Sequence, residues 1–141
     1  MNYLLHTNVV SEWVKPRPND NVIAWLAEAN EEEIFISVCT FAELRFGVAS
    51  MAKGSRRDRL DDWLSSDLPA RFDRRIVGID VPIADAWGLI QARARHSGRP
   101  IGPMDGLIAA TAEVHEMTLV TRNTKHFETV GLALLNPWTD R

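Results

Sequence analysis

The sequence predicts an α/β protein: a three-layer α/β/α sandwich with a mainly parallel central sheet. Short apolar runs rich in β-branched residues alternate along the chain with longer segments of helical periodicity. This alternation is typical of parallel strands joined by crossover helices that cover both faces of a sheet. Hydrophobic residues make up 45% of the 141, which is enough for a core of that kind.

Five segments have the character of strands. The first is expected to be short and buried, and it ends in the turn-like residues His6, Thr7 and Asn8. The second, from Ile34 to Val38, is a β-rich run bounded by polar residues. The predicted strands are residues 2–5, 34–38, 76–79, 118–121 and 133–135.

Helical segments fill the intervals and are expected to begin near residues 9, 20, 40, 55, 82 and 104. Thr7 or Asn8 can cap the first of them, because a side-chain oxygen there accepts the free amides of the first turn. Ser55 is expected to cap the fourth helix, and Leu68 with Pro69 to end it. A proline at position 103 suits the start of the last helix.

Length and composition bound the class of protein. The chain contains neither repeats nor a linker, so residues 1–141 are expected to form a single domain. The one cysteine, Cys39, excludes an internal disulfide and suits a reducing compartment. Apolar runs stay far below the ~20 residues of a membrane span, so we expect a cytoplasmic protein.

The formal net charge of the chain is −3, which argues against a protein that binds nucleic acid through overall positive charge. A local basic run remains between Trp87 and Met104, where Asp and Glu are absent. It contains Arg93, Arg95, His96 and Arg99. The run fits the rim of a nuclease site, and it fits an ordinary solvated helix face as well.

Polar residues follow several of the predicted strands. Ligands of open parallel sheets bind at the carboxyl ends of the strands, so these residues are candidates for a common site. They are His6, Thr7 and Asn8 after the first strand, Glu43 one turn into the helix after the second, Thr121, Arg122 and Asn123 after the fourth, and Asp105 in the first turn of the helix that leads into the fourth.

These candidates include two carboxylates, a histidine and an amide. Mg²⁺ and Mn²⁺ prefer oxygen ligands, and beside a phosphodiester such an ion can activate water and neutralise charge on the phosphate. The spacing by itself is equally compatible with the polar strand ends that every α/β domain has.

The same segments resemble those of a known family, the PIN domain. In that family an Asp-Thr/Ser-Asn motif follows the first strand, an Ala-Glu-Leu segment lies in a helix, and an Asp-Gly-x-Ile-Ala-Ala-Thr-Ala segment opens a later helix. A Thr-Arg-Asn/Asp segment then precedes a phenylalanine. The matching segments here are His6 to Asn8, Ala42 to Leu44, Asp105 to Ala112, and Thr121 to Asn123 with Phe127, and the ending Asn136-Pro137-Trp138 is similar to the FitB-type branch of the VapC toxins.

The resemblance implies a Mg²⁺- or Mn²⁺-dependent endoribonuclease toxin. His6, Glu43 and Asp105 would be its catalytic residues, and the same three with Asn123 would surround the metal. Asn123 stands where some members carry an acid. Thr7, Asn8, Thr121 and Arg122 would support the site, and Arg93, Arg95 and Arg99 would guide RNA toward it. The simpler alternatives are Asn8 as a helix cap and Arg122 as a surface charge.

Partners are implied in the same way. Toxins of this kind pair with a small antitoxin, here one similar to VapB or FitA, which occupies the active site. The antitoxin also binds operator DNA, which the toxin reaches only through it. The substrate would be RNA, with tRNA as one candidate. A homodimer is expected, and the apolar helix faces that carry Trp25 and Trp63 are compatible with it.

His6 departs from the family pattern, because the motif has an aspartate at this position. The change removes a negative charge and replaces an oxygen ligand with an imidazole nitrogen. Mg²⁺ tolerates this poorly, whereas Mn²⁺ or Zn²⁺ accepts nitrogen more readily. We therefore expect impaired Mg²⁺ binding and slow or absent RNA cleavage, whether the histidine is natural or introduced. A purely structural His6 is the alternative.

Two other functions stay open at this point. A catalytically inactive PIN domain could act as an antitoxin-binding or co-repressor module, and His6 favours this hypothesis. A nuclease of the same fold directed at DNA is the third, although nothing in the sequence points to it.

Overall fold

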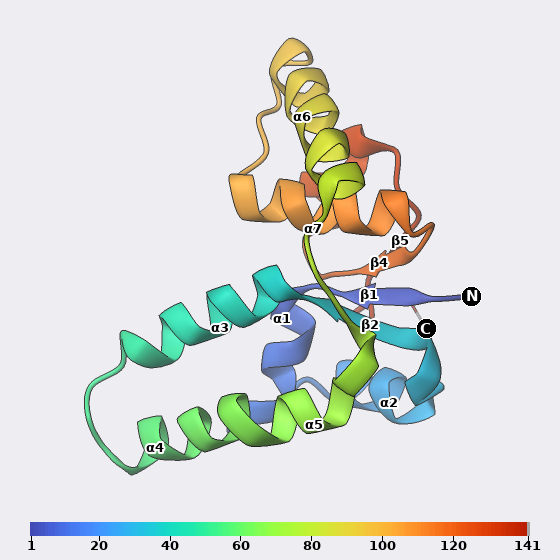
Figure 1. The fold of residues 1–141 in the computed structure, drawn as a ribbon. Helices are drawn as coiled ribbons and strands as arrows, with labels where there is room; N and C mark the ends of the chain where they lie inside the picture. The colour runs from blue at the N-terminus through green and yellow to red at the C-terminus, as the bar shows by residue number, and fades with distance from the viewer. Residues whose placement is uncertain (141) are drawn as a thin grey trace.

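The structure, a computed structural model, describes residues 1–140 and contains one five-stranded parallel sheet. The strand order is β3-β2-β1-β4-β5, so the chain begins in the middle of the sheet (Figure 1). Every neighbouring pair runs parallel. The strands are β1 (Tyr3–Leu5), β2 (Ile34–Ser37), β3 (Ile76–Val77), β4 (Thr118–Val120) and β5 (Leu134–Leu135).

Helices cover both faces of this sheet, which confirms the predicted three-layer α/β/α class. In Figure 1, α6 and α7 lie above the sheet, α1, α2 and α5 lie below it, and α3 extends to the left from the end of β2. The helices are α1 (Thr7–Val10), α2 (Asp20–Glu28), α3 (Val38–Ala49), α4 (Ser55–Asp62), α5 (Leu68–Phe72), α6 (Val81–His96), α7 (Pro103–Val114) and α8 (Thr124–Phe127). Within residues 1–140 none of them has the length and apolar character that crossing a bilayer requires.

The core consists of two apolar layers, one on each face of the sheet. Successive side chains of a strand point to opposite faces, so Leu4 packs with Ile90 and Ile108 of α6 and α7. Its neighbour Leu5 packs on the other side with Val10 and Phe72. Short strands buried on both faces explain why the predicted strands read as continuous apolar runs.

Several element boundaries differ from the sequence prediction, among them those of α3, β3 and the helix that opens at Ser55. Helix α3 begins at Val38 rather than Thr40, because the Ser37 hydroxyl accepts the Cys39 amide at 3.0 Å and caps it. Strand β3 ends at Val77, two residues before the predicted end. The helix that opens at Ser55 does not end at Leu68 and Pro69: it continues through a π-helical stretch, Trp63–Asp67, into α5.

The continuation past Pro69 has a simple cause. Pro69 lies in the first turn of α5, where the missing amide hydrogen of proline removes little hydrogen bonding. Leu64, Leu68 and Phe72 are spaced four residues apart along this continuous helix, and all three are buried.

Helices α6 and α7 approach each other closely at Gly106. A Cβ atom at this position would come within 2.5 Å of Gln91 Nε2 and 2.9 Å of Trp87 Nε1. Those two nitrogens donate to the carbonyls of Gly102, at 3.5 Å, and Pro103, at 3.0 Å. The glycine therefore lets α6 hold the first turn of α7, which carries Asp105.

Glu12 is a buried acid that fixes the segment after α1. Its Oε1 accepts the Asn19 amide at 2.8 Å, and its Oε2 is paired with the Lys15 ammonium. Burial by itself raises the pKa of Glu12, but the Lys15 and Asn19 hydrogen bonds and the charges of Lys15 and Arg122 together lower the pKa below its usual value.

This lowered pKa makes a prediction about stability and pH. A carboxylate whose pKa is depressed in the folded state stabilises it above the unfolded pKa, and the contribution is lost as the pH falls through the folded value. We expect Glu12→Gln to cost about 1–2 kcal/mol in the free energy of unfolding at pH 7 and less at pH 3. Urea denaturation at both pH values measures this, with the exposed Glu32→Gln as control. An equal cost at the two pH values would contradict it.

Candidate active site

Strands β1 and β4 bring the first and last motifs together. The two strands are parallel neighbours, so the residues that follow them, His6 and Thr121, lie side by side at the carboxyl edge of the sheet. The His6 amide donates to the Val120 carbonyl at 2.9 Å, which continues the strand pairing by one residue. The ring nitrogen Nδ1 of His6 lies 2.8 Å from Thr121 Oγ1.

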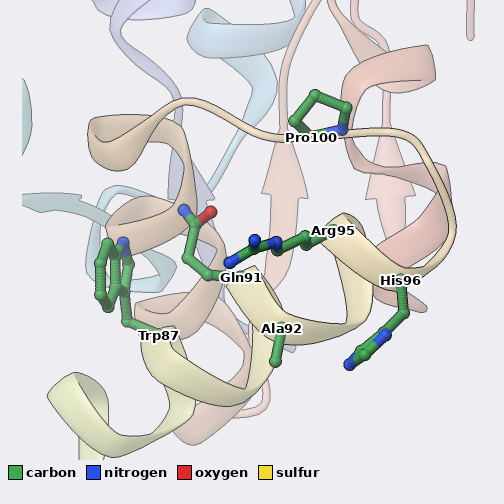
Figure 2. A pocket seen from close by; sticks show the side chains of 6 residues that line it. All are labelled: Trp87, Gln91, Ala92, Arg95, His96 and Pro100. Carbon is green, nitrogen blue, oxygen red and sulfur yellow. The ribbon is translucent and has the colours of Figure 1, made fainter.

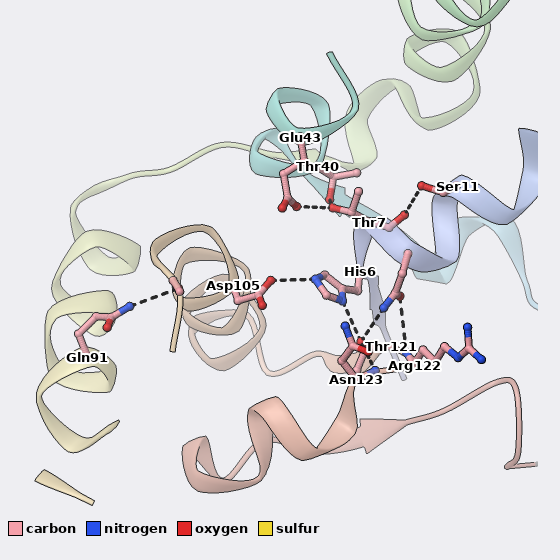
Figure 3. Close-up of polar contacts among 12 residues, drawn as sticks. His6, Thr7, Ser11, Thr40, Glu43, Gln91, Asp105, Thr121, Arg122 and Asn123 are labelled. Carbon is pink, nitrogen blue, oxygen red and sulfur yellow. Dashed lines mark hydrogen bonds and ion pairs between the residues drawn. The ribbon is translucent and has the colours of Figure 1, made fainter. Parts of the chain in front are cut away.

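The His6 side chain also contacts the third motif. Its Nε2 lies 3.0 Å from Asp105 Oδ1, a contact between residues 99 positions apart (Figure 3). The ring is only 5% exposed and packs edge-on against Phe127, with ring centroids 5.4 Å apart. The Asp105 side chain is 26% exposed, so the dyad has a buried histidine and a carboxylate that reaches the surface.

The Thr121 hydroxyl is the centre of this network and favours one tautomer of the neutral His6 ring. Oγ1 accepts the Asn123 amide at 3.0 Å and the Asn8 side-chain amide at 3.4 Å. Because these two donors take both lone pairs, the hydroxyl hydrogen points to His6 Nδ1. The neutral ring then carries its proton on Nε2 and donates it to Asp105. Both ring nitrogens are used inside the protein, and neither offers a lone pair to an ion.

Glu43 reaches the same edge from α3 and is held there by Thr7. The Thr7 hydroxyl donates to Glu43 Oε1 at 2.5 Å and lies 3.1 Å from the hydroxyl of Thr40. Thr7 is the residue after His6, so the second carboxylate is attached to the motif that carries the histidine, as Figure 3 shows. The sequence-predicted residues His6, Thr7, Glu43, Asp105 and Thr121 therefore form one connected cluster.

Asn8 and Arg122 tie the first motif to the end of β4. Helix α1 begins at Thr7 with His6 in the cap position, so the predicted start at Val9, with Thr7 or Asn8 as the cap, is wrong. The Asn8 side chain instead bonds Thr121 and accepts the Arg122 amide at 3.5 Å. The Arg122 guanidinium lies over the Trp138 ring, 5.4 Å from its centroid.

Asn123 and the basic run lie around this cluster in different ways. Asn123 is exposed at the start of α8, and its backbone amide, not its side chain, bonds Thr121. Arg99 lines a cavity together with Asp105. Arg95 lines a second cavity, whereas Arg93 extends toward Glu113 of α7, at 3.5 Å.

Two further residues, Lys125 and His126, to which the sequence assigned no part in the site, also line the Asp105 cavity. They follow the Thr-Arg-Asn segment by two and three positions, so that segment is the signal that could have pointed to them. Their side of the cavity depends on the short helix α8, which the sequence analysis did not predict.

The side chains present do not fit a Mg²⁺ site. The carboxylate oxygens of Glu43 and Asp105 suit a hard divalent ion, but the third donor is an imidazole that is already bonded on both nitrogens. Among residues 1–140, no three His, Cys, Asp or Glu side chains come together as a metal-binding group. The arrangement is that of a carboxylate site closed by a histidine.

Known proteins are similar to this chain in sequence and in fold. The PIN domain profile matches residues 3–132. The toxin FitB of Neisseria gonorrhoeae is 40% identical over 97% of this chain and 99% of its own length. The VapC ribonuclease Y4jK of Sinorhizobium fredii is 38% identical over 96% of both chains. The structure of FitAB bound to an IR36 DNA fragment superposes with a TM-score of 0.93 at 38% identity, over 99% of this chain and 97% of that one. The chain therefore belongs to the PIN-domain family, in the branch of VapC toxins that includes FitB.

Proposed function

We propose that this protein is the toxin of a type II toxin–antitoxin pair, an endoribonuclease whose hydrolysis of RNA phosphodiesters depends on Mg²⁺ or Mn²⁺. One observation carries the proposal: in a PIN domain, Asp105 bonded to His6 and Glu43 bonded to Thr7 lie at the same carboxyl edge of the sheet. Two carboxylates at such an edge suit a divalent ion beside a phosphodiester.

The relatives support the substrate and the partners. One is described as a VapC ribonuclease and another as a toxin, and the FitAB structure holds the toxin with its partner and DNA. We extend these properties to this chain: RNA as substrate, tRNA as the first RNA to test, and a small VapB- or FitA-like antitoxin that carries the operator DNA contact. A homodimer is part of the same proposal.

This chain has a groove next to the site that suits an antitoxin segment. A cavity of about 260 Å³ between α1, α3 and α4 is lined largely by apolar side chains, among them Leu44, Val48 and Trp63. Thr7 and Glu43 line it as well, so the groove is continuous with the active-site cluster. An apolar antitoxin segment in this groove would cover Glu43 and so block access to the site.

The histidine at position 6 impairs this activity in the chain as it stands. Its Nε2–H is directed at the Asp105 oxygen that a divalent ion needs, and the buried ring occupies the space between the first and third motifs. With aspartate at position 6, a third carboxylate would replace the ring, and Glu43 and Asp105 would be free to contribute oxygen ligands.

An alternative function follows from the same contact. If the His6–Asp105 bond persists in the cell, the domain is an inactive member that binds antitoxin or acts as a co-repressor. Recovery of a small partner together with a failure of every RNA to be cut, by this chain and by His6→Asp, would favour this alternative.

The test of the function uses Asp105→Asn in a His6→Asp background. We expect this substitution to reduce divalent-ion-dependent cleavage of tRNA by at least about a hundredfold, because it removes a charged oxygen ligand. Asp85→Asn, an exposed acid on α6, is the matched control and should leave the rate unchanged. Equal rates for the two double variants would remove Asp105 from the mechanism.

A further inference from the structure

The basic run between Trp87 and Met104 lines two adjoining cavities, and one of them also contains Asp105 and residues of α8. The first has a volume of about 350 Å³ and is lined by Arg99, Lys125, His126 and Asp105 together with residues 100–102. The second has a volume of about 670 Å³ and is lined by Trp87, Gln91, Ala92, Arg95, His96 and Pro100 (Figure 2). Pro100 lines both, so the two cavities are neighbours on one face.

The charges in the Asp105 cavity favour an anion. Arg99 and Lys125 outnumber its single carboxylate, and His126 adds a further hydrogen-bond donor. Arg99 Nη2 donates to the Lys125 carbonyl at 3.0 Å, which holds the guanidinium across the cavity wall and leaves its other N–H groups free. Its contact with Glu128, at 3.8 Å between exposed side chains, is too long and too solvated to neutralise it.

The α6 cavity has a different character. Its lining is mostly apolar and includes the indole of Trp87, with Arg95 extended along the wall, as Figure 2 shows. Arg95 and Lys125 take part in none of the ion pairs within residues 1–140. An aromatic ring and an unpaired arginine are the groups that bind a base and its backbone in single-stranded nucleic acid sites.

The α6 cavity is also coupled to the catalytic carboxylate. Trp87 and Gln91 hydrogen-bond the carbonyls of Pro103 and Gly102, directly before Asp105. They pack on Gly106, directly after it. A ligand in the α6 cavity therefore touches the side chains that hold the first turn of α7 in place.

We propose that these cavities are two consecutive subsites for single-stranded RNA. Arg99 and Lys125 hold a backbone phosphate beside Asp105, and the adjacent nucleotide lies in the α6 cavity against Trp87, Gln91 and Arg95. This rests on the proposed ribonuclease function and specifies where its substrate lies. Arg93 has no part in it, because its side chain faces Glu113 and lines neither cavity.

The test measures binding of a fluorescein-labelled single-stranded RNA to the unmodified chain in EDTA, so that cleavage does not interfere. We expect Arg99→Ala, Lys125→Ala and Arg95→Ala each to raise Kd about five- to tenfold, and Arg93→Ala to change it less than about twofold. For Arg99→Ala and Lys125→Ala the slope of log K against log salt should fall by about 0.7. Arg99→Lys keeps the charge and should keep that slope, which separates a phosphate contact from a structural role.

Each other outcome overturns the proposal in a defined way. If Arg93→Ala weakens binding as much as Arg99→Ala, RNA is attracted by diffuse charge and not by these subsites. If Gln91→Ala and Arg95→Ala leave Kd unchanged but shift the sedimentation mass, the α6 cavity is a contact between two copies of the chain. If the His6→Asp protein cuts RNA and the added Arg99→Ala and Arg93→Ala substitutions change its cleavage rate equally, the proposed subsites are wrong but the ribonuclease function is supported. If His6→Asp cuts no RNA, the proposed function itself fails.

Discussion

Replacing His6 with aspartate is expected to raise the affinity of the protein for Mn²⁺ and Mg²⁺ by about a hundredfold. The substitution removes the ring that donates to Asp105 and adds a carboxylate at the same place. Titration calorimetry of the partner-free protein measures this directly.

The same substitution has a second consequence, on stability. Three carboxylates gathered without an ion repel one another, so the metal-free His6→Asp protein should unfold at a lower temperature than the parent chain. Saturating Mn²⁺ should raise its Tm, because an ion that binds only the folded state stabilises it. His115→Asp, at the far end of α7, makes the same change of charge and should leave both the ion affinity and the response of Tm to Mn²⁺ unchanged. Equal ion affinity in all three proteins would show that His6 does not block the site.

Phe127→Ala is expected to have the largest effect on stability, about 3–5 kcal/mol in the free energy of unfolding. The Phe127 ring is fully buried in the apolar layer beneath α6 and α7, and it is the surface against which the His6 ring packs. Truncation leaves a cavity that β4 and α7 cannot close without moving the Thr121 network. Phe46→Ala is the matched control, because that ring is 76% exposed and its loss should cost less than about 0.5 kcal/mol.

Urea denaturation measures both substitutions. If Phe127→Ala lowered the free energy of unfolding by no more than Phe46→Ala does, the packing of Phe127 beneath the site would not stabilise the fold. A large cost with an unchanged His6–Thr121 contact, seen as an unchanged ring ¹⁵N spectrum of His6, would separate stability from the position of the histidine.

The fold could be predicted because its signals are local. Each strand is a short run of β-branched or apolar residues buried on both faces, and each crossover helix has its own periodicity. The predicted ends of helices were less accurate where the same residue type can either end a helix or lie in its first turn. Pro69 ends a helix when it falls inside one but is tolerated in a first turn, and only the π-helical stretch before it determines which applies.

The sequence could predict which candidate residues lie together at the edge of the sheet, but it could not predict their contacts. Strand order and the family motifs place His6, Glu43 and Asp105 at one edge, since parallel strands end together. The bond between His6 and Asp105 depends on the Thr121 hydroxyl, which is 115 positions from His6 and accepts two amides. A hydrogen-bond pattern of this kind depends on how the side chains pack and cannot be inferred from the spacing of residues along the sequence.

The helical positions of the basic residues in α6 indicate which of them share a face, and their charges alone do not. Residues two apart on a helix lie about 200° apart around its axis, so Arg93 and Arg95 must face different directions. The structure bears this out: Arg93 faces Glu113, and Arg95 lines the cavity beside Trp87. The helical spacing alone could therefore have assigned Arg93 and Arg95 to different faces of α6. The contribution of Lys125 depends on the short helix α8, which sequence periodicity does not reveal.

The most direct test of a ribonuclease site closed by His6 is a single-turnover assay. Total tRNA is incubated with the partner-free chain and with His6→Asp, in Mg²⁺ and in Mn²⁺, with EDTA controls. We expect the His6→Asp protein alone to cut RNA, and only with a divalent ion. Equal cutting by both proteins would contradict the claim that His6 closes the site, and cutting by neither would contradict the ribonuclease function.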